Sequence, residues 1–259
     1  SAASDVYKRQ IKTSPDWLQN RLKAIGITPK NNIIDITNFV LHHLGQPLHA
    51  FDLNKIKGGI IVKNVPQDTT FVTLDGVSRK LHADDLMICD HQKPLCIAGI
   101  FGGQDSGVSE NTKSIFLESA YFDPVSIRKS AKRHGLNTDA SFRFERGIDP
   151  QFTSKALSYA AKLVVELAGG TIEGKPYDIK QELPKAYKFM LSYEQINNTI
   201  GQEISKDEVS KILTGLEIKI ESSDEGGMLV EIPQYRVDVT RPADVIEEIL
   251  RVYGYNNVK

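Results

Sequence analysis

The sequence predicts an α+β fold with a mostly antiparallel central sheet flanked by helices, followed by a small winged-helix-like α+β domain. Two observations lead to this fold class. Apolar residues recur at helical spacing near the start and again beyond residue 123, whereas between these regions the period changes to two and turn residues separate short runs. A run of helices, then strands, then helices is typical of an α+β domain.

The first half of the chain contains the expected helices and most of the strands. Ser14 and Pro15 are read as an N-cap and a first helical residue, and Gly26 ends that helix. The next helix is expected over 33–44, capped by Asp35 or Thr37. Strands are expected at 60–65, 70–74, 86–89, 95–100 and 114–122, with a hairpin turn at 75–76. The first ten residues show no pattern and receive no assignment.

The second half returns to helical signals. Asp-Pro pairs begin helices at 123 and 149, and glycines end them at 135 and 169. A linker over 180–185 divides two predicted domains, residues 1–183 and 184–259. In the second domain we expect helices at 192–200, 205–213 and 242–253 and strands at 217–220 and 229–232. This order resembles that of a winged DNA-binding fold.

Composition narrows the possible functions. The chain has 259 residues, 40% of them hydrophobic and 25% charged, with a net charge of −1. A protein with so little net charge must contact nucleic acid through local patches. Cys89 and Cys96 are expected to be free core thiols, because the cytosol keeps thiols reduced. No apolar run reaches the ~20 residues that span a bilayer, and no signal peptide is visible, so we expect a cytoplasmic, soluble protein.

Four segments carry the most specific information. Residues 134–147 set small and hydroxyl side chains beside Arg143, Glu145 and Arg146, a mixture suited to a polar, partly anionic ligand. The other three are GQPLHAFD at 45–52, GIFGG at 99–103 and RVYGYN at 251–256. Taken together in their order along the chain, the four segments closely resemble the β subunit of bacterial phenylalanyl-tRNA synthetase. The resemblance covers nearly everything from Ser14 onward.

The resemblance implies an editing domain of the B3/B4 type followed by a small B5-type domain. In that family the β chain is much longer, and aminoacylation takes place on a separate α subunit within an α2β2 tetramer. ATP binding and ligase activity therefore belong to the parent enzyme, and this chain is not expected to charge tRNA alone. The implied partners are the α subunit and the tRNA for phenylalanine, and no membrane is involved. We expect the small domain to act as a spacer and subunit contact.

The resemblance also implies hydrolysis of tyrosine wrongly esterified to the tRNA for phenylalanine. An apolar pocket rejects an added hydroxyl only weakly, which calls for a second, hydrolytic sieve. Strand alternation alone favours an exposed Glu118, but the resemblance makes it the acceptor of the phenol proton. The remaining residues that bind substrate by this resemblance are Gly102, Thr138 and Ala140.

Two further polar residues receive catalytic roles by the same resemblance. His49 and Asn38 match positions at the mouth of the pocket, near the terminal adenosine or the attacking water. Water attack assisted by His49 and attack assisted by the substrate's own ribose hydroxyl both remain open. The sequence shows no Ser-His-Asp arrangement.

A basic helix offers a candidate RNA contact. Arg128, Lys132 and Arg133 are the predicted phosphate ligands. The alternative is a solvated helix face with ion pairs to Glu145 or Asp139. Structural pairing is the favoured interpretation for Arg143 and Arg146.

Clustered carboxylates in the small domain suggest a metal ion. Asp238, Asp244, Glu247 and Glu248 are hard oxygen ligands of the kind Mg²⁺ prefers. The alternative is an acidic first helical turn that offsets the helix dipole. The resemblance implies a magnesium site shared with the α subunit and empty or weak without it.

Two other functions compete with the editor. One is a non-catalytic tRNA-binding or scaffold module, inactive apart from the synthetase. The other is a carboxylate-based metal hydrolase built on the acidic cluster, which is disfavoured because no histidine accompanies the carboxylates.

Overall fold

The computed structural model describes residues 2–7, 11–179 and 183–258. The chain divides into two compact units, residues 1–181 and 182–259, close to the boundary expected between 183 and 184. Each unit combines antiparallel sheets with helices, so the predicted α+β class is confirmed. Of the linker expected at 180–185, residues 180–182 lie outside the described residues.

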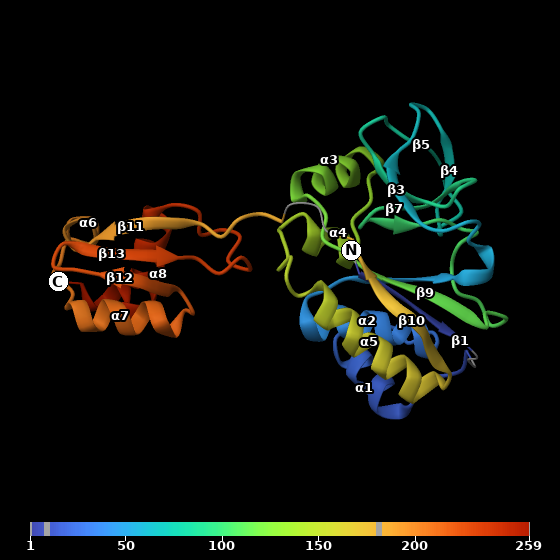
Figure 1. The fold of residues 1–259 in the computed structure, drawn as a ribbon, viewed down its shortest axis with the longest axis horizontal. Coiled ribbons are helices and arrows are strands. Elements are labelled where there is room, and N and C mark those ends of the chain that lie inside the picture. The colour runs from blue at the N-terminus through green and yellow to red at the C-terminus, as the bar shows by residue number, and fades with distance from the viewer. Residues whose placement is uncertain (1, 8–10, 180–182, 259) are drawn as a thin grey trace. The chain divides into compact units, whose positions relative to one another are not determined.

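A four-stranded antiparallel sheet in the order β10-β1-β9-β2 organises the larger unit. Helices α1, α2 and α5 cover one face of it (Figure 1). The strands are β1 (Ala2–Tyr7), β2 (Leu48–Asp52), β9 (Ser114–Ser119) and β10 (Thr171–Asp178). The helices are α1 (Asp16–Ala24), α2 (Asn32–Leu44) and α5 (Thr153–Ala168).

A second group of strands packs over the other face of this sheet. It contains a sheet in the order β3-β6-β7-β8 and a separate hairpin, β4-β5. The strands are β3 (Ile61–Asn64), β4 (Thr70–Val72), β5 (Ser78–Lys80), β6 (Leu86–Cys89), β7 (Pro94–Ile97) and β8 (Phe101–Gly102). The 3-10 turn η1 (Leu53–Lys55) precedes them, and α3 (Pro124–His134) and α4 (Asp139–Phe144) follow β9 in the chain.

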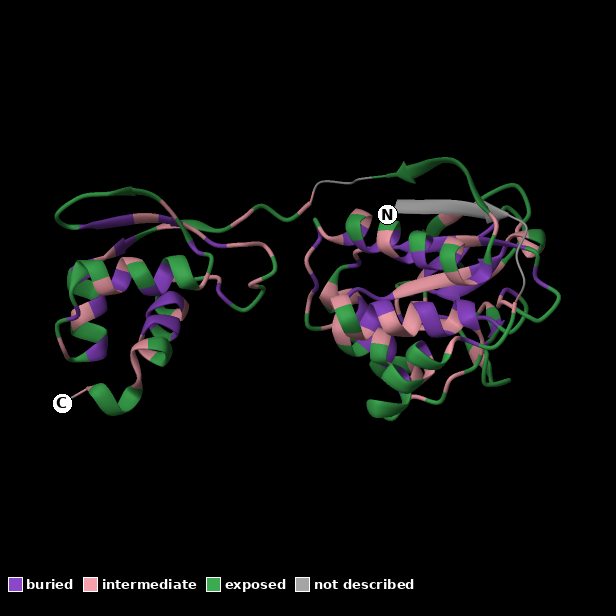
Figure 2. Ribbon diagram, turned by 90° about the horizontal axis from the view of Figure 1, so that it is seen from below, coloured by how far each residue is buried: buried purple, intermediate pink, exposed green. Residues whose placement is uncertain are grey.

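Strand β9 separates two hydrophobic cores. Ile115 and Leu117 join the core beneath α1, α2 and α5. Phe116 and Ala120 join the core formed with the second group of strands and α3. Because successive side chains of a strand point to opposite faces, Glu118 lies on the same side as Phe116. Figure 2 shows that buried residues line the inner faces of the helices and strands, with exposed residues outside.

The smaller unit has its own core around a three-stranded antiparallel sheet in the order β11-β13-β12. Helices α6 and α8 contact the sheet strand β11, and α7 packs on β12 and α8. The strands are β11 (Lys188–Ser192), β12 (Lys219–Ser223) and β13 (Gly227–Glu231). The helices are α6 (Tyr193–Ile200), α7 (Lys206–Gly215), α8 (Pro242–Tyr253) and the 3-10 turn η2 (Tyr255–Asn257).

Several predicted helix ends are confirmed by capping contacts. The side chain of Asp123 accepts a hydrogen bond from Ser126 N at 2.7 Å, and Gly135 ends α3 in the left-handed conformation. Ser192 and Ser205 cap α6 and α7 as expected. The predicted hairpin at 75–76 joins β4 to β5, with Gly76 at φ +77°.

Other predicted ends are wrong. Helix α2 is capped by Asn31, whereas Asp35 accepts hydrogen bonds from Ser14 Oγ at 2.5 Å and Lys30 N at 2.8 Å. Ser14 is therefore buried with Asp35 and does not cap α1, whose cap position is Pro15. Helix α5 begins at Thr153, because the Asp-Pro pair at 149–150 forms a turn before the helix.

The strands absent from the prediction are β1, β2, β5, β8, β10 and β11. Strand β10 is exposed at every position, so it has no alternation of burial to detect. Strand β2 follows Pro47 within a motif that resembles a loop. Strand β1 falls among the ten residues that received no assignment, of which 1 and 8–10 lie outside the described residues.

Cys89 and Cys96 are free and buried, as predicted. Among the described residues, no helix is long and apolar enough to cross a membrane.

The cap of α2 gives a first testable prediction. Asn31→Ala removes the acceptor that bonds Ile33 N and Ile34 N. We expect it to lower the free energy of unfolding by about 1 kcal/mol, the usual worth of an N-cap side chain. Urea unfolding followed by circular dichroism measures this. Lys30→Ala is the control, since that side chain is exposed, and an equal loss in both variants would contradict the capping role.

Candidate functional site

Strands β2 and β9 place His49 and Glu118 directly opposite each other in the antiparallel register. Both side chains lie on the face turned toward the second group of strands, where Phe51 and Phe116 also lie. The His49 ring packs edge-on against Phe51 with ring centroids 4.3 Å apart. Cross-strand neighbours of this kind have Cβ atoms about 5 Å apart. The sheet therefore presents a histidine and a carboxylate side by side among aromatic rings.

Glu118 differs from the other buried carboxylates of the described chain. Asp35, Asp52, Asp85 and Asp90 each accept at least two hydrogen bonds, and Glu248 is paired with two arginines. Glu118 is 8% exposed and forms no hydrogen bond to any described residue. Burial raises the pKa of its carboxyl group from 4.5 to about 7. A buried carboxylate without a donor is expected to bind a ligand that supplies one.

His49 is half-buried, and its ring also lacks a partner at one edge. Its Nε2 is buried and finds no hydrogen-bond partner among the described residues. Burial lowers the pKa of the imidazole from 6.5 to about 4, so the ring is neutral at neutral pH. A neutral imidazole can accept a proton from water or from a hydroxyl group.

Gly102 brings the backbone of β8 close to this pair. A Cβ atom at Gly102 would lie 3.1 Å from His49 Cε1 and 2.8 Å from Leu74 Cδ1. The neighbouring strand β7 contributes Cys96, which pairs with Gly102. Burial, and secondly the nearby Glu118 carboxylate, raises the pKa of the Cys96 thiol. The side chains of His49 and Leu74 thus border the position where glycine leaves space.

Thr138 and Ala140 stand at the start of α4. The Thr138 hydroxyl donates to Ile100 O at 3.0 Å and accepts from Ser141 N at 3.0 Å. It therefore caps α4 and fixes that helix to the turn that precedes Gly102. Ala140 is half-buried and packs on the same core as Phe116. Because the Thr138 hydroxyl already bonds Ile100 O and Ser141 N, it would serve a binding site by holding α4 in place.

Asn38 lies on α2, one turn before His42, and the two residues share a helix face. His42 Nε2 is 3.7 Å from Asp139 Oδ2, which places this face of α2 beside the start of α4. Asn38 is half-buried. The structure thus gathers the predicted residues around two places, the His49–Glu118 pair with Gly102 and the α2–α4 contact with Asn38.

Comparison with known proteins identifies the family of each unit. Residues 4–169 match the family model of the B3/4 domain. The chain belongs to the B3/4 domain family. Residues 189–255 match the model of the tRNA synthetase B5 domain, which corresponds to the smaller unit.

The relatives are phenylalanine–tRNA ligase β subunits. That of Bacteroides fragilis strain YCH46 is 56% identical over 250 residues, covering 96% of this chain and 30% of the relative. That of Porphyromonas gingivalis is 56% identical over 251 residues with the same coverage, and that of Fusobacterium nucleatum is 43% identical over 250 residues. The predicted resemblance is confirmed, and the chain spans about 30% of the length of these relatives.

A crystal structure of an N-terminal fragment of the phenylalanyl-tRNA synthetase β subunit from Pyrococcus horikoshii aligns with 98% of this chain and 71% of its own chain. Its sequence identity to this chain is 17% and the TM-score is 0.43.

The basic residues of the B3/4 domain are less free than the sequence suggests. Arg133 forms an ion pair with the buried Asp85, and Arg128 Nη2 donates to Glu145 O at 2.9 Å. Lys132 is exposed and contacts no partner among the described side chains. Arg146 pairs with Glu145, as the structural interpretation predicted. The surface that α3 offers to phosphate is therefore mainly Lys129 and Lys132 with the exposed edge of Arg128.

The acidic residues of the B5 domain are not gathered into a metal site. Asp244 Oδ2 accepts from Arg241 N at 2.9 Å, and hydrogen bonding from the Arg241 side chain lowers the pKa of Asp244 to about 2. Glu248 lies between Arg236 and Arg251. Among the described residues, no group of three or more His, Cys, Asp or Glu could hold a metal ion. Asp238, Asp244, Glu247 and Glu248 therefore do not fit a magnesium site made by this chain alone.

Three residues near the site had no functional prediction. Leu74 lies against Gly102, His42 lies beside Asp139, and Gln46 Nε2 donates to Ala120 O at 2.9 Å, joining the turn before β2 to the end of β9. The sequence signal for Leu74 was its place beside the Asp-Gly turn. His42 and Gln46 had none beyond their neighbouring motif.

The His49–Glu118 pair gives a prediction about pH. The folded pKa of Glu118, about 7, lies above its ordinary 4.5, so its contribution to stability is present at low pH and is lost as pH rises to 7. The folded pKa of His49, about 4, lies below 6.5, so its contribution is present above 6.5 and is lost as pH falls to 4. Between pH 4.5 and 6.5, rising pH therefore lowers the contribution of Glu118 to stability and raises that of His49.

Single substitutions should therefore reveal opposite slopes. Relative to wild type, the free energy of unfolding of His49→Gln should fall as pH rises, and that of Glu118→Gln should increase. Each change should be on the order of 3 kcal/mol over the pH range between the ordinary and folded pKa of the group removed. Denaturant unfolding from pH 4 to 8 measures both. Parallel curves for the two variants would contradict the assigned directions.

Two adjacent glycines give a matched pair of substitutions. A Cβ at Gly103 would lie 2.6 Å from Leu95 O, a backbone atom, whereas that at Gly102 meets only side-chain atoms. We expect Gly103→Ala to lower the free energy of unfolding by roughly 2 kcal/mol. Gly102→Ala should cost less than half as much and instead impair ligand binding. Thermal melts and binding of a tyrosyl ester analogue test this, and equal destabilisation by both would refute the distinction.

Proposed function

We propose that the B3/4 domain of this chain hydrolyses tyrosine wrongly esterified to the tRNA for phenylalanine. The observation that carries this proposal is Glu118, a buried carboxylate without a hydrogen-bond donor among the described residues, set beside the neutral His49. A tyrosyl group brings both a donor for Glu118 and an aromatic ring for its apolar surroundings, Phe51 and Phe116.

Selectivity follows from the difference of one hydroxyl. The phenol of tyrosine donates a hydrogen bond to the Glu118 carboxylate, which favours the ionised form of the group. The phenyl ring of phenylalanine supplies no donor, so the carboxylate stays unpaired at a cost of about 1–3 kcal/mol. This supports discrimination of roughly ten- to hundredfold against the correct ester, the direction that an editing site needs.

Hydrolysis requires an oriented water molecule. The water oxygen attacks the ester carbonyl carbon, the bond to the ribose oxygen breaks, and that oxygen receives the proton that water releases. His49 Nε2 lies unpaired beside Gly102 and is suited to orient the water or accept its proton. Asn38, on the adjoining helix, is the second candidate for this role. Assistance by the ribose hydroxyl of the substrate fits the same geometry.

The tRNA and the other subunit are the proposed partners. Lys132 and Arg128 lie on the exposed face of α3 and would contact phosphate, while Arg133 supports the fold through Asp85. We assign the B5 domain to contact with the α subunit in a cytoplasmic α2β2 synthetase. Any magnesium there requires ligands from that subunit, because arginines engage Asp244 and Glu248 and the described residues contain no group of three or more possible ligands.

A scaffold without chemistry of its own is the second candidate. The small number of free cations on α3 favours it, since few contacts would hold a tRNA once the domain is separated from the rest of a synthetase. Under this alternative the His49–Glu118 pair is intact, but no ester reaches it.

The deciding experiment is hydrolysis of tyrosyl-tRNA for phenylalanine by this chain, with the phenylalanyl ester as the comparison. Selective release of tyrosine is expected. Glu118→Ala should reduce the ratio of the two kcat/KM values by about tenfold or more. Glu166→Ala serves as control, because that carboxylate is exposed on α5.

The outcomes separate the hypotheses. An unchanged ratio in Glu118→Ala would remove Glu118 from recognition of the phenol. Release of neither amino acid by the unaltered chain would favour the scaffold.

A further inference from the structure

Two segments that enclose the site are far apart in sequence. The turn of the β4-β5 hairpin reaches Gly102, because Leu74 N donates to Gly102 O at 3.0 Å and the Leu74 side chain lies over that glycine. On the other side, the end of α3 leads from His134 through Gly135 into Thr138 and α4. No backbone hydrogen bond between described residues joins the hairpin to the end of α3.

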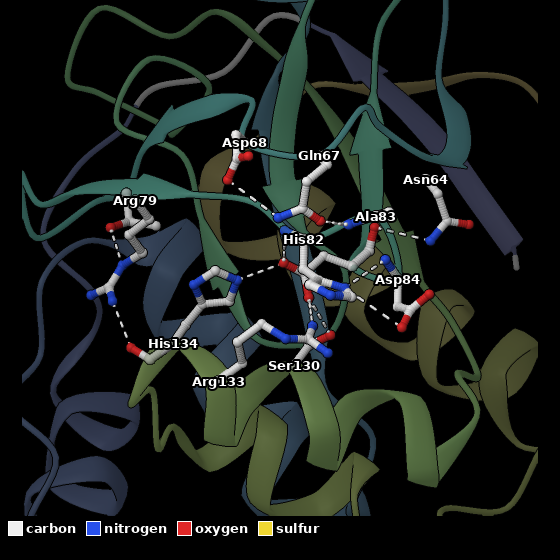
Figure 3. A network of polar contacts seen from close by, with 12 residues as sticks. Asn64, Gln67, Asp68, Arg79, His82, Ala83, Asp84, Ser130, Arg133 and His134 are labelled. Carbon is white, nitrogen blue, oxygen red and sulfur yellow. Dashed lines mark hydrogen bonds and ion pairs between the residues drawn. The ribbon is translucent and has the colours of Figure 1, made fainter.

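Arg79 connects these two segments. On the hairpin side, its Nε donates to Thr73 Oγ1 and its Nη2 to Asp75 Oδ2, each at 2.9 Å. On the helix side, its Nη1 donates to His134 O at 2.7 Å. The side chain is 14% exposed. Figure 3 shows the guanidinium reaching the His134 carbonyl group.

His134, whose carbonyl oxygen accepts from Arg79, is itself held in place by other contacts. His134 Nε2 lies 2.6 Å from Asp85 Oδ2, and Ser130 Oγ donates to Asp85 Oδ1 at 2.7 Å. Burial alone would raise the pKa of Asp85, but hydrogen bonds from His82 N, His134 and Ser130 hold it below its ordinary value. Ser130 and His134 lie on α3 with Arg133, on the side of the helix that meets the loop before β6 (Figure 3). The end of α3 is therefore a fixed support.

We propose that Arg79 is a positioning residue for the site. Its planar guanidinium holds the hairpin that carries Leu74 at a set distance from the segment that carries Thr138 and Ala140. Arginine suits this role because one rigid fork directs separate donors at two elements, which a lysine ammonium cannot do. The inference rests on the proposed function, because the spacing of the two segments matters only for an ester bound between them.

The test uses two substitutions of Arg79 and a neighbour as control. Arg79→Gln removes the charge and the fork, whereas Arg79→Lys keeps the charge alone. Lys80→Gln is the control, because Lys80 is exposed on the same strand and, among the described residues, its Nζ bonds Thr70 Oγ1 alone. Circular dichroism first verifies that each protein is folded. If Arg79→Gln is unfolded, the test rests on Arg79→Lys alone.

The first readout is amide hydrogen exchange, which needs no activity. We expect exchange to accelerate about fivefold in both 73–77 and 134–141 for the Gln and Lys variants, with no change in the control. Acceleration in one segment alone, or normal exchange in Arg79→Lys, would overturn the proposal, because the coupling would then not depend on the fork.

The second readout is the split of kinetic constants for tyrosyl ester hydrolysis. Displacement of the hairpin that carries Leu74 should raise KM about tenfold. It should change kcat less than twofold, because no reacting group is removed. Equal loss of kcat in both variants with KM unchanged would also overturn the proposal. If the unaltered chain releases no tyrosine, the editing function fails, whereas the exchange measurement still decides the coupling by Arg79.

Discussion

The register between β2 and β9 is the constraint on which the candidate site depends. It sets His49 opposite Glu118, and strand alternation sends both side chains to the face shared with Phe51 and Phe116. A slip of β2 by one residue would turn Ala50 toward the site and His49 toward the helices, and it would leave Glu118 without its histidine neighbour. The register is secured from both ends. Gln46 bonds Ala120 O, and Asp52 accepts from Thr112 Oγ1 at 2.7 Å. The GQPLHAFD motif therefore specifies a strand position as well as carrying the candidate histidine.

Much of the α+β organisation follows from local chemistry that the sequence displays. The Asp-Pro start and Gly end of α3, the hairpin at 75–76 and the last helix at 242–253 are each determined within a few residues, and each was predicted. The failures have a common cause, which is dependence on distant partners. Asp35 resembles a helix cap until Ser14 is known to lie beside it. Strand β10 has no buried face and is defined only by pairing with β1.

The site was predictable in part for the same reason. The family resemblance suggested Glu118, His49 and Gly102, whereas strand alternation alone favoured an exposed Glu118, and only the fold shows that the three are neighbours. The basic helix shows the converse. Arg133 has the spacing of a phosphate ligand, yet the buried carboxylate of Asp85, 48 residues away in sequence, takes its charge. The acidic cluster of the B5 domain likewise reads as metal ligands, although Arg236, Arg241 and Arg251 already neutralise Asp244 and Glu248. Charge patterns in sequence omit the counter-charges that folding supplies.

The contrast between Asp85 and Glu118 indicates where this fold keeps unmet hydrogen-bonding capacity. Both carboxylates are buried on the same domain, and desolvation acts on both. Around Asp85 the chain supplies a backbone N–H, a hydroxyl, an imidazole and a guanidinium, so the charge strengthens the junction of α3 with the second group of strands. Around Glu118 the described chain supplies aromatic rings and an unpaired imidazole. Leaving a carboxylate in that state lowers stability, and a leucine of similar size would remove the unpaired charge. The arrangement is therefore understandable as the cost of a binding site whose missing donor arrives with the ligand, while the fully satisfied Asp85 network holds the surrounding walls in place.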